Sequence, residues 1–322
     1  MRRRTVFVCI IAALIVLVSS CAPGNEKEDK PSVVVTIFPE YDWVLNILGE
    51  LKDGYEVSLI LDKGVDIHNF QPTVDDMLKI RNADMFIYVG GESDAWVEDL
   101  LKGEHNSSML ILDLMEILKD DIREEEKKES MTDEDEEEGK EGPEYDEHVW
   151  LSLRFAEKVC GAIRDAFTSL DKENADIYEK NFEAYALKLR EMDGKYKATV
   201  ASSSKRGILI PDRFPFRYMT EDYGLDYHAA FKGCSAESEA SFETIRFLSE
   251  KLKELGLRYV IITESSDGKL ADTVIRDSGK TDCGILVMDS MQSTTLSDYE
   301  EGTTYLKIME ENLTVLEKAL GE

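Results

Sequence analysis

Short apolar segments rich in β-branched residues recur along the chain, and each is followed by a stretch with the apolar spacing of an amphipathic helix. In the first half these segments are V-V-V-T-I-F from Val33, V-S-L-I-L from Val57, M-F-I-Y-V from Met85 and M-L-I-L from Met109. In the second half they are G-I-L-I from Gly207, Y-V-I-I-T from Tyr259 and G-I-L-V-M from Gly284. Strands that alternate with helices form parallel sheets. The pattern therefore predicts two Rossmann-like α/β lobes with mostly parallel sheets.

The segment between the two sets of strands has a helical pattern almost throughout. Residues 151–203 contain no proline, and apolar residues recur at three- and four-residue spacing between Ala175 and Lys197. One long, rigid helix would join the lobes. We expect an N-terminal lobe over residues 33–150, a helical region over 151–203 that includes this linking helix, and a C-terminal lobe over 204–322.

A highly charged segment interrupts the first lobe at about residues 119–147. It contains the run E-E-E-K-K-E and the run D-E-D-E-E-E, which are too polar to be buried. We expect a disordered acidic loop here, flanked by ordered structure on both sides.

The N-terminus has the pattern of an export signal. Three arginines precede an uncharged apolar stretch from Val6 to Val18, and two serines follow it before Cys21. The apolar stretch of about 13 residues is shorter than the roughly 20 that span a bilayer. V-S-S-C resembles the bacterial lipobox, which implies a signal peptide over residues 1–20, a lipid on Cys21 and a flexible tether over 21–32. The chain would then be anchored to the outer face of the cytoplasmic membrane.

Charge and cysteine content narrow the classes of function. The formal net charge is −29, so we expect no nucleic-acid partner. With Cys9 removed and Cys21 lipidated, Cys160, Cys234 and Cys283 remain, which allows one disulfide at most and no C-x-x-C zinc cluster. Pairing of Cys234 with Cys283 stays open.

Several polar residues with metal-ligand chemistry follow the predicted strands, where ligands bind in open α/β sheets. They are His68, Asp212, Glu264 and Asp289, each in the segment that follows a predicted strand, and a further candidate, His148, ends the acidic loop. Imidazole nitrogen with carboxylate oxygen suits zinc, manganese or iron(II), whereas calcium prefers oxygen alone. His105 fits an exposed turn and His228 a short strand, and neither is assigned a function.

From Val33 to Leu320 the order of motifs resembles the zinc and manganese solute-binding lipoproteins of metal ABC importers. D-I-H-N-F-Q-P-T-V-D-D looks like the first ligand loop of that family, D-E-H-V-W-L-S-L like its second ligand motif and V-M-D-S-M-Q like its last ligand segment. The resemblance implies that His68, His148 and Asp289 bind the ion between two lobes. A divalent metal, with Zn²⁺ favoured over Mn²⁺, would be the cargo, and an ABC permease the partner.

The resemblance departs from the family pattern at the third ligand. Where the family has His or Glu before F-x-Y, an ungapped match places Arg213, with Asp212 one residue earlier. Asp212 ranks ahead of Glu264 as the substitute, and water is a further alternative.

The expected function is binding and delivery of a metal ion by a monomeric, non-enzymatic protein. Manganese or iron(II) in the same role is the nearest alternative, followed by a surface adhesin or a metallohydrolase. H-E-x-x-H and G-x-S-x-G motifs, which would favour a hydrolase, do not occur in the sequence. Protons compete for imidazole nitrogen, so affinity should weaken as pH falls through the histidine range near about 6.5.

Overall fold

A computed structural model describes residues 30–64, 66–126, 144–234 and 239–321. The predicted signal peptide, Cys21 and all but the last three residues of the tether lie outside the described residues. Residues 32–322 belong to one compact unit. In the described part of the chain, no helix combines the length and the apolar character that crossing a membrane requires.

The first half contains a four-stranded parallel sheet, as the apolar segments predict. Its strands are β1 (Ser32–Val35), β2 (Glu56–Leu59), β3 (Met85–Tyr88) and β4 (Leu110–Asp113), in the order β2-β1-β3-β4. Val33 in the central strand β1 pairs with Val57 on one side and Met85 on the other. Because helices cover both faces of such a sheet, its central residues are apolar at successive positions, and Val33, Val34 and Val35 are all buried.

The helical segments of this half lie between and after the strands. They are α2 (Phe38–Leu48), η1 (Gly49–Gly54), η2 (Ile67–Asn69), α3 (Val74–Asn82), α4 (Ala95–Lys102) and α5 (Leu114–Ile117).

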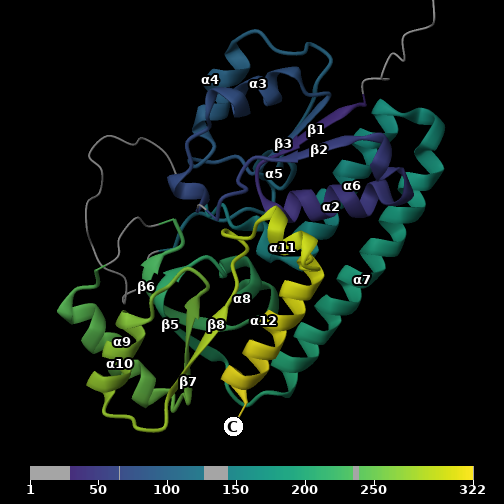
Figure 1. Cartoon of the computed structure of the whole chain (residues 1–322). Helices are drawn as coiled ribbons and strands as arrows, with labels where there is room; N and C mark the ends of the chain where they lie inside the picture. The colour runs from purple at the N-terminus through teal and green to yellow at the C-terminus, as the bar shows by residue number, and fades with distance from the viewer. Residues whose placement is uncertain (1–29, 65, 127–143, 235–238, 322) are drawn as a thin grey trace, which may run out of the picture. The chain divides into compact units, whose positions relative to one another are not determined.

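The middle of the chain is helical, as predicted. Its segments are η3 (Val149–Leu151), α6 (Leu153–Leu170), η4 (Lys172–Asn174) and α7 (Ala175–Ser202). The long helix α7 contacts both halves of the fold (Figure 1). Tyr185 donates a hydrogen bond to Asp42 of α2 at 3.0 Å, and Tyr196, three turns later, donates one to the carbonyl of Met309 at 2.7 Å.

The second half contains two pairs of parallel strands. The strands are β5 (Gly207–Phe214), β6 (Asp226–Lys232), β7 (Tyr259–Thr263) and β8 (Gly284–Met288), paired as β5-β6 and β7-β8. Its helices are α8 (Arg217–Tyr223), α9 (Phe242–Glu254), α10 (Lys269–Ser278), α11 (Leu296–Glu300) and α12 (Tyr305–Leu320). His228 lies in β6, which confirms its predicted place in a strand.

The main hydrophobic core extends through both halves, while a smaller core lies within the second half between strands β5 to β8 and helices α9 and α10. Trp43 of α2 packs edge to face on Tyr305 of α12, with 5.2 Å between ring centroids. Both rings are fully buried. The α/β fold with two lobes and parallel sheets is thus the one that the sequence predicts.

The acidic segment is ordered at both ends. Glu124 and Tyr145 form an antiparallel bridge, and the backbone of Arg123 donates to the Tyr218 hydroxyl at 3.1 Å. Backbone hydrogen bonds therefore hold residues that the sequence assigns to a disordered loop. The remaining residues of that loop, 127–143, lie outside the described residues.

Candidate metal centre

His68 is presented by a single turn that follows strand β2. Asp66 precedes this turn, and its carboxylate accepts a hydrogen bond from the His68 backbone N–H at 3.0 Å. The ring nitrogen Nδ1 lies 2.7 Å from the Ser93 hydroxyl. This contact orients the ring, leaving Nε2 as the nitrogen that faces the second histidine.

His148 lies directly before η3 and is completely buried. One oxygen of Asp146 accepts from both the backbone N–H and the ring Nδ1 of His148, each at 2.9 Å. A carboxylate only accepts hydrogen bonds, so Nδ1 carries a proton, and Nε2 presents a lone pair when the ring is neutral. Carboxylates hold metal-binding imidazoles in this way in many proteins.

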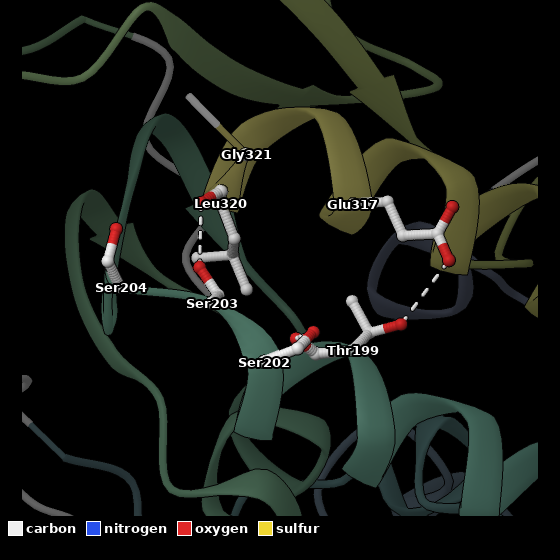
Figure 2. Close-up of a pocket in the computed structure, with 7 residues that line it drawn as sticks. All are labelled: Thr199, Ser202, Ser203, Ser204, Glu317, Leu320 and Gly321. Carbon is white, nitrogen blue, oxygen red and sulfur yellow. Dashed lines mark hydrogen bonds between the residues drawn. The ribbon is translucent and has the colours of Figure 1, made fainter.

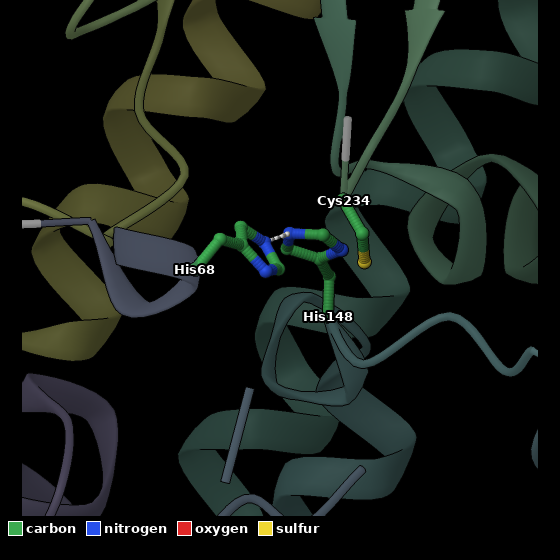
Figure 3. Close-up of side chains that lie close together, drawn as sticks. All are labelled: His68, His148 and Cys234. Carbon is green, nitrogen blue, oxygen red and sulfur yellow. Dashed lines mark hydrogen bonds between the residues drawn. The ribbon is translucent and has the colours of Figure 1, made fainter. Parts of the chain in front are cut away.

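The two histidines meet although 80 residues separate them in the chain. Their Nε2 atoms lie 3.2 Å apart, and their ring centroids 5.2 Å apart (Figure 3). Zinc binds imidazole nitrogen at about 2.0–2.1 Å in tetrahedral geometry, which places two such nitrogens about 3.3 Å apart. The pair therefore has the spacing of two ligands on one ion.

Cys234 joins this pair from the second half of the chain, just after β6. Its sulfur and one ring nitrogen of each histidine all lie within 4.8 Å of one another. Gly233 packs against the His148 ring so closely that an added Cβ would lie 2.8 Å from Cε1. The backbone can pass here only because residue 233 has no side chain.

Acidic side chains surround the candidate ligands. Glu147 is 2% exposed on its side chain, and its Oε2 lies 3.8 Å from His68 Nδ1. Glu125 accepts from the backbone N–H of Cys234 at 3.4 Å. The nearby cation is Arg213, which forms a 2.8 Å ion pair with Asp66. Such a cluster attracts a positive ion.

This environment moves the pKa values of the two histidines in opposite directions. Burial, and then repulsion from a charged His148, lower the pKa of His68. Burial also opposes protonation of His148, but the neighbouring carboxylates, Asp146 above all, raise its pKa above the usual value. His68 is thus a free base at neutral pH, ready to bind a metal.

The other predicted ligands do not belong to this group. The Asp212 carboxylate accepts from the backbone N–H and hydroxyl of Thr263, at 3.1 and 3.0 Å. Glu264 accepts from the backbone N–H and hydroxyl of Ser290, both at 2.8 Å. Each carboxylate thus bonds to its own lobe in this structure.

Asp289 accepts from the Met291 backbone N–H at 2.7 Å. Burial, and then the charge of Glu264, raise the pKa of Asp289 to about 7. As ligands, Asp212, Glu264 and Asp289 stay predictions.

Sequence reasoning omitted two kinds of residue around the histidines. It considered Cys234 only as a possible disulfide partner of Cys283; the one signal of another role is its place just after the strand that contains His228. It also missed Asp146 and Ser93, whose roles depend on contacts across the fold. Among the described residues Cys160, Cys234 and Cys283 are all free, so Cys234 and Cys283 do not pair here.

A separate hollow of about 460 Å³ lies where α7 and α12 end. Figure 2 shows the hydroxyls of Ser202, Ser203 and Ser204 along it, with the Ser203 hydroxyl donating to the Leu320 carbonyl at 2.7 Å. None of the predicted metal ligands lines this hollow.

Known proteins that resemble this chain include zinc-binding proteins and components of zinc uptake. The family model described as "Zinc-uptake complex component A periplasmic" matches residues 33–319. The zinc-binding lipoprotein AdcA of Streptococcus pneumoniae is 29% identical over 328 residues, covering 100% of this chain and 62% of its own length. The high-affinity zinc uptake system protein ZnuA of Bacillus subtilis is 28% identical and is covered almost completely, at 97% of this chain and 96% of its own length. The chain spans 56% of the AdcA proteins of Streptococcus pyogenes.

Solved structures show the same architecture. The Zn(II)-bound ZnuA-like domain of Streptococcus pneumoniae AdcA aligns with a TM-score of 0.71 at 26% identity, covering 91% of this chain and 100% of that domain. Two lobes with parallel sheets are common to both.

Proposed function

Because this chain belongs to the family of periplasmic zinc-uptake components, we propose that it captures a zinc ion outside the cytoplasmic membrane and delivers it to an ABC permease. The observation that carries this proposal is the approach of His68 and His148, whose Nε2 atoms lie 3.2 Å apart. Imidazole donors at this distance suit zinc, and the surrounding carboxylates favour a divalent cation.

Manganese or iron(II) is the nearest alternative cargo. Manganese prefers oxygen ligands, whereas imidazole suits zinc. The two histidines supply nitrogen, and Asp289 and Asp212 are the carboxylates proposed for the remaining positions, with Glu264 as the alternative to Asp212. Each of these carboxylates accepts hydrogen bonds in this structure, and a carboxylate has further lone pairs with which it can bind an ion. In this proposal the protein binds and releases the ion and performs no covalent chemistry. The metallohydrolase role is therefore not part of it.

Titration calorimetry on the detergent-solubilised full chain, stripped of metal, tests the binding step. We expect one site that binds zinc more tightly than manganese, and loss of zinc binding in the His68→Ala, His148→Ala double variant. His105→Ala is the matched control, because His105 is exposed in a loop and its substitution should leave binding unchanged. If the double variant retains the affinity of the unmodified chain, the proposed centre is wrong.

Anchoring and delivery need a separate test in cells. The lipid on Cys21 is proposed from the V-S-S-C motif, which lies outside the described residues. A strain that lacks the gene should take up radioactive zinc slowly when zinc is scarce, and the unmodified chain should restore uptake. Cys21→Ala should abolish incorporation of a labelled fatty acid. Normal zinc uptake without the gene would contradict a role in delivery.

A further inference from the structure

We propose that Cys234 binds the cargo ion directly as a thiolate, which makes the centre a two-histidine, one-cysteine site that selects zinc over manganese. This proposal rests on the metal-binding function proposed above. It adds a ligand from the second half of the chain to the two that the first half supplies.

The Cys234 sulfur lies near both imidazoles. The Cys234 sulfur and one ring nitrogen of each histidine lie within 4.8 Å of one another, and Figure 3 shows the sulfur beside the His148 ring. Zinc binds sulfur at about 2.3 Å and nitrogen at about 2.0–2.1 Å, so the ligand atoms of one ion lie about 3.3–3.6 Å apart. The cysteine side chain must therefore turn toward the two imidazoles when the ion binds.

The local backbone is built to bring the cysteine to this place. A Cβ at position 233 would lie 2.8 Å from His148 Cε1 and also 2.8 Å from the Phe214 carbonyl oxygen. Gly233 thus lets the chain after β6 run directly against the imidazole. The next residue along is Cys234, and its backbone N–H bonds to Glu125.

A second, independent observation favours a cation at this place. Glu147 is 2% exposed, and within the described residues its buried Oε2 atom has no hydrogen-bond partner. That oxygen faces His68 Nδ1 at 3.8 Å. A buried carboxylate oxygen without a partner is costly, and a divalent ion held by the adjacent His68 would balance its charge.

The chemistry of the donor set determines which ion is preferred. Metal binding replaces the S–H bond by a metal–sulfur bond, and the thiol proton passes to solvent without any oxidation or reduction. Thiolate binds zinc strongly, whereas manganese prefers carboxylate and water. Cys234 therefore strengthens zinc binding far more than manganese binding.

Cobalt(II) provides the test, because it occupies zinc sites and a bound thiolate gives it an intense near-ultraviolet charge-transfer band. The detergent-solubilised full chain should bind one Co²⁺ and show this band. Cys234→Ser should lose the band while Cys283→Ser, the matched control, keeps it. Binding of Co²⁺ by the unmodified chain without the band would overturn the thiolate and leave the proposed function intact. Failure to bind either Co²⁺ or Zn²⁺ would overturn both.

A measurement on the unmodified chain keeps the proposal independent of how well the variant folds, and a second compares two metals on the variant. In the unmodified chain, zinc should slow alkylation of Cys234 at least about tenfold and leave Cys283 unaffected; equal slowing of both would count against the thiolate. Cys234→Ser should lose zinc affinity by about 100-fold, the upper end of what loss of an outer-shell partner costs. Its manganese affinity should change much less, and an equal loss for both metals would refute the selectivity.

Discussion

At the scale of single residues, the candidate centre depends on close neighbours that fix the two imidazole rings. Gly233 touches the His148 ring, Asp146 holds its Nδ1, and Ser93 holds the ring of His68. Each of these positions acts through a histidine. Small changes in them should therefore alter metal binding without removing a ligand.

Gly233→Ala tests the closest of these contacts. The new methyl group would lie 2.8 Å from both the His148 ring and a backbone oxygen, so the imidazole must shift. We expect zinc affinity, measured by calorimetry, to fall by about tenfold or more, as for loss of an outer-shell partner. Gly194→Ala in α7 is the control, since a Cβ there meets nothing within 4 Å. Equal affinities in the two variants would contradict the role of Gly233.

A second residue-scale prediction concerns Glu40, which is fully buried in α2. Its Oε2 accepts from the backbone N–H of Thr36 at 2.8 Å, and burial raises its pKa to about 8. The folded protein thus keeps a proton up to about pH 8 that the unfolded chain releases near 4.5. The proton stabilises the fold fully below pH 4.5, the pKa of Glu40 in the unfolded chain. This stabilisation is lost as pH rises to about 8, the pKa of Glu40 in the folded protein.

Glu40→Gln should remove this pH dependence. Between about pH 5 and pH 8, the free energy of unfolding of the unmodified chain should fall relative to the variant by several kcal/mol at most, since one pKa unit is about 1.4 kcal/mol. Urea unfolding at both pH values measures the difference. Glu50→Gln, at an exposed position of η1, should behave like the unmodified chain. If the free energy of unfolding of Glu40→Gln changes with pH as much as that of the unmodified chain, Glu40 is ionised in the fold.

At the scale of elements, the second half shows how one side chain connects two strand pairs. Strand β5 pairs with β6, and β7 pairs with β8. Asp212 of β5 accepts from both the backbone and the side chain of Thr263 at the end of β7. The residue that sequence reasoning proposes as a ligand thus joins two elements in this structure.

Asp212→Ala separates the two roles. Loss of the acceptor leaves the partly buried Thr263 N–H without its bond, so we expect a destabilisation of about 1–3 kcal/mol in urea unfolding. Zinc affinity measured on the same variant decides the rest. If it falls as far as in the variant that lacks both histidines, Asp212 is a ligand after all.

At the scale of the whole molecule, contacts within the protein join the two halves. Helix α7 bonds to α2 near one end and to α12 near the other, and the main core includes residues of both halves. The Arg213–Asp66 ion pair adds a direct link beside the histidines. A continuous helix resists bending more than an extended hinge does. Metal binding should therefore move side chains and loops rather than whole lobes.

Small-angle X-ray scattering on the full chain in detergent-free form, with Cys21→Ala to prevent lipidation, checks this expectation. The radius of gyration should be the same, within error, before and after addition of zinc. The same measurement on the variant that lacks both histidines controls for nonspecific effects of the metal. A clear compaction confined to the chain that retains the histidines would mean that α7 does not hold the lobes in a fixed arrangement.

The sequence by itself determined the α/β fold class, the strand positions that precede His68, Asp212, Glu264 and Asp289, and the long helix, because burial imposes a periodic pattern on local sequence. β6 was evident only as a short strand at His228, since its apolar residues end at charged Asp226 and Lys232. The resemblance to metal-binding lipoproteins implied that His68 and His148 meet, whereas only the tertiary structure decided that Cys234 joins them and that Asp212 faces Thr263. Distances between residues far apart in the chain depend on how the loops pack, and no periodicity records them.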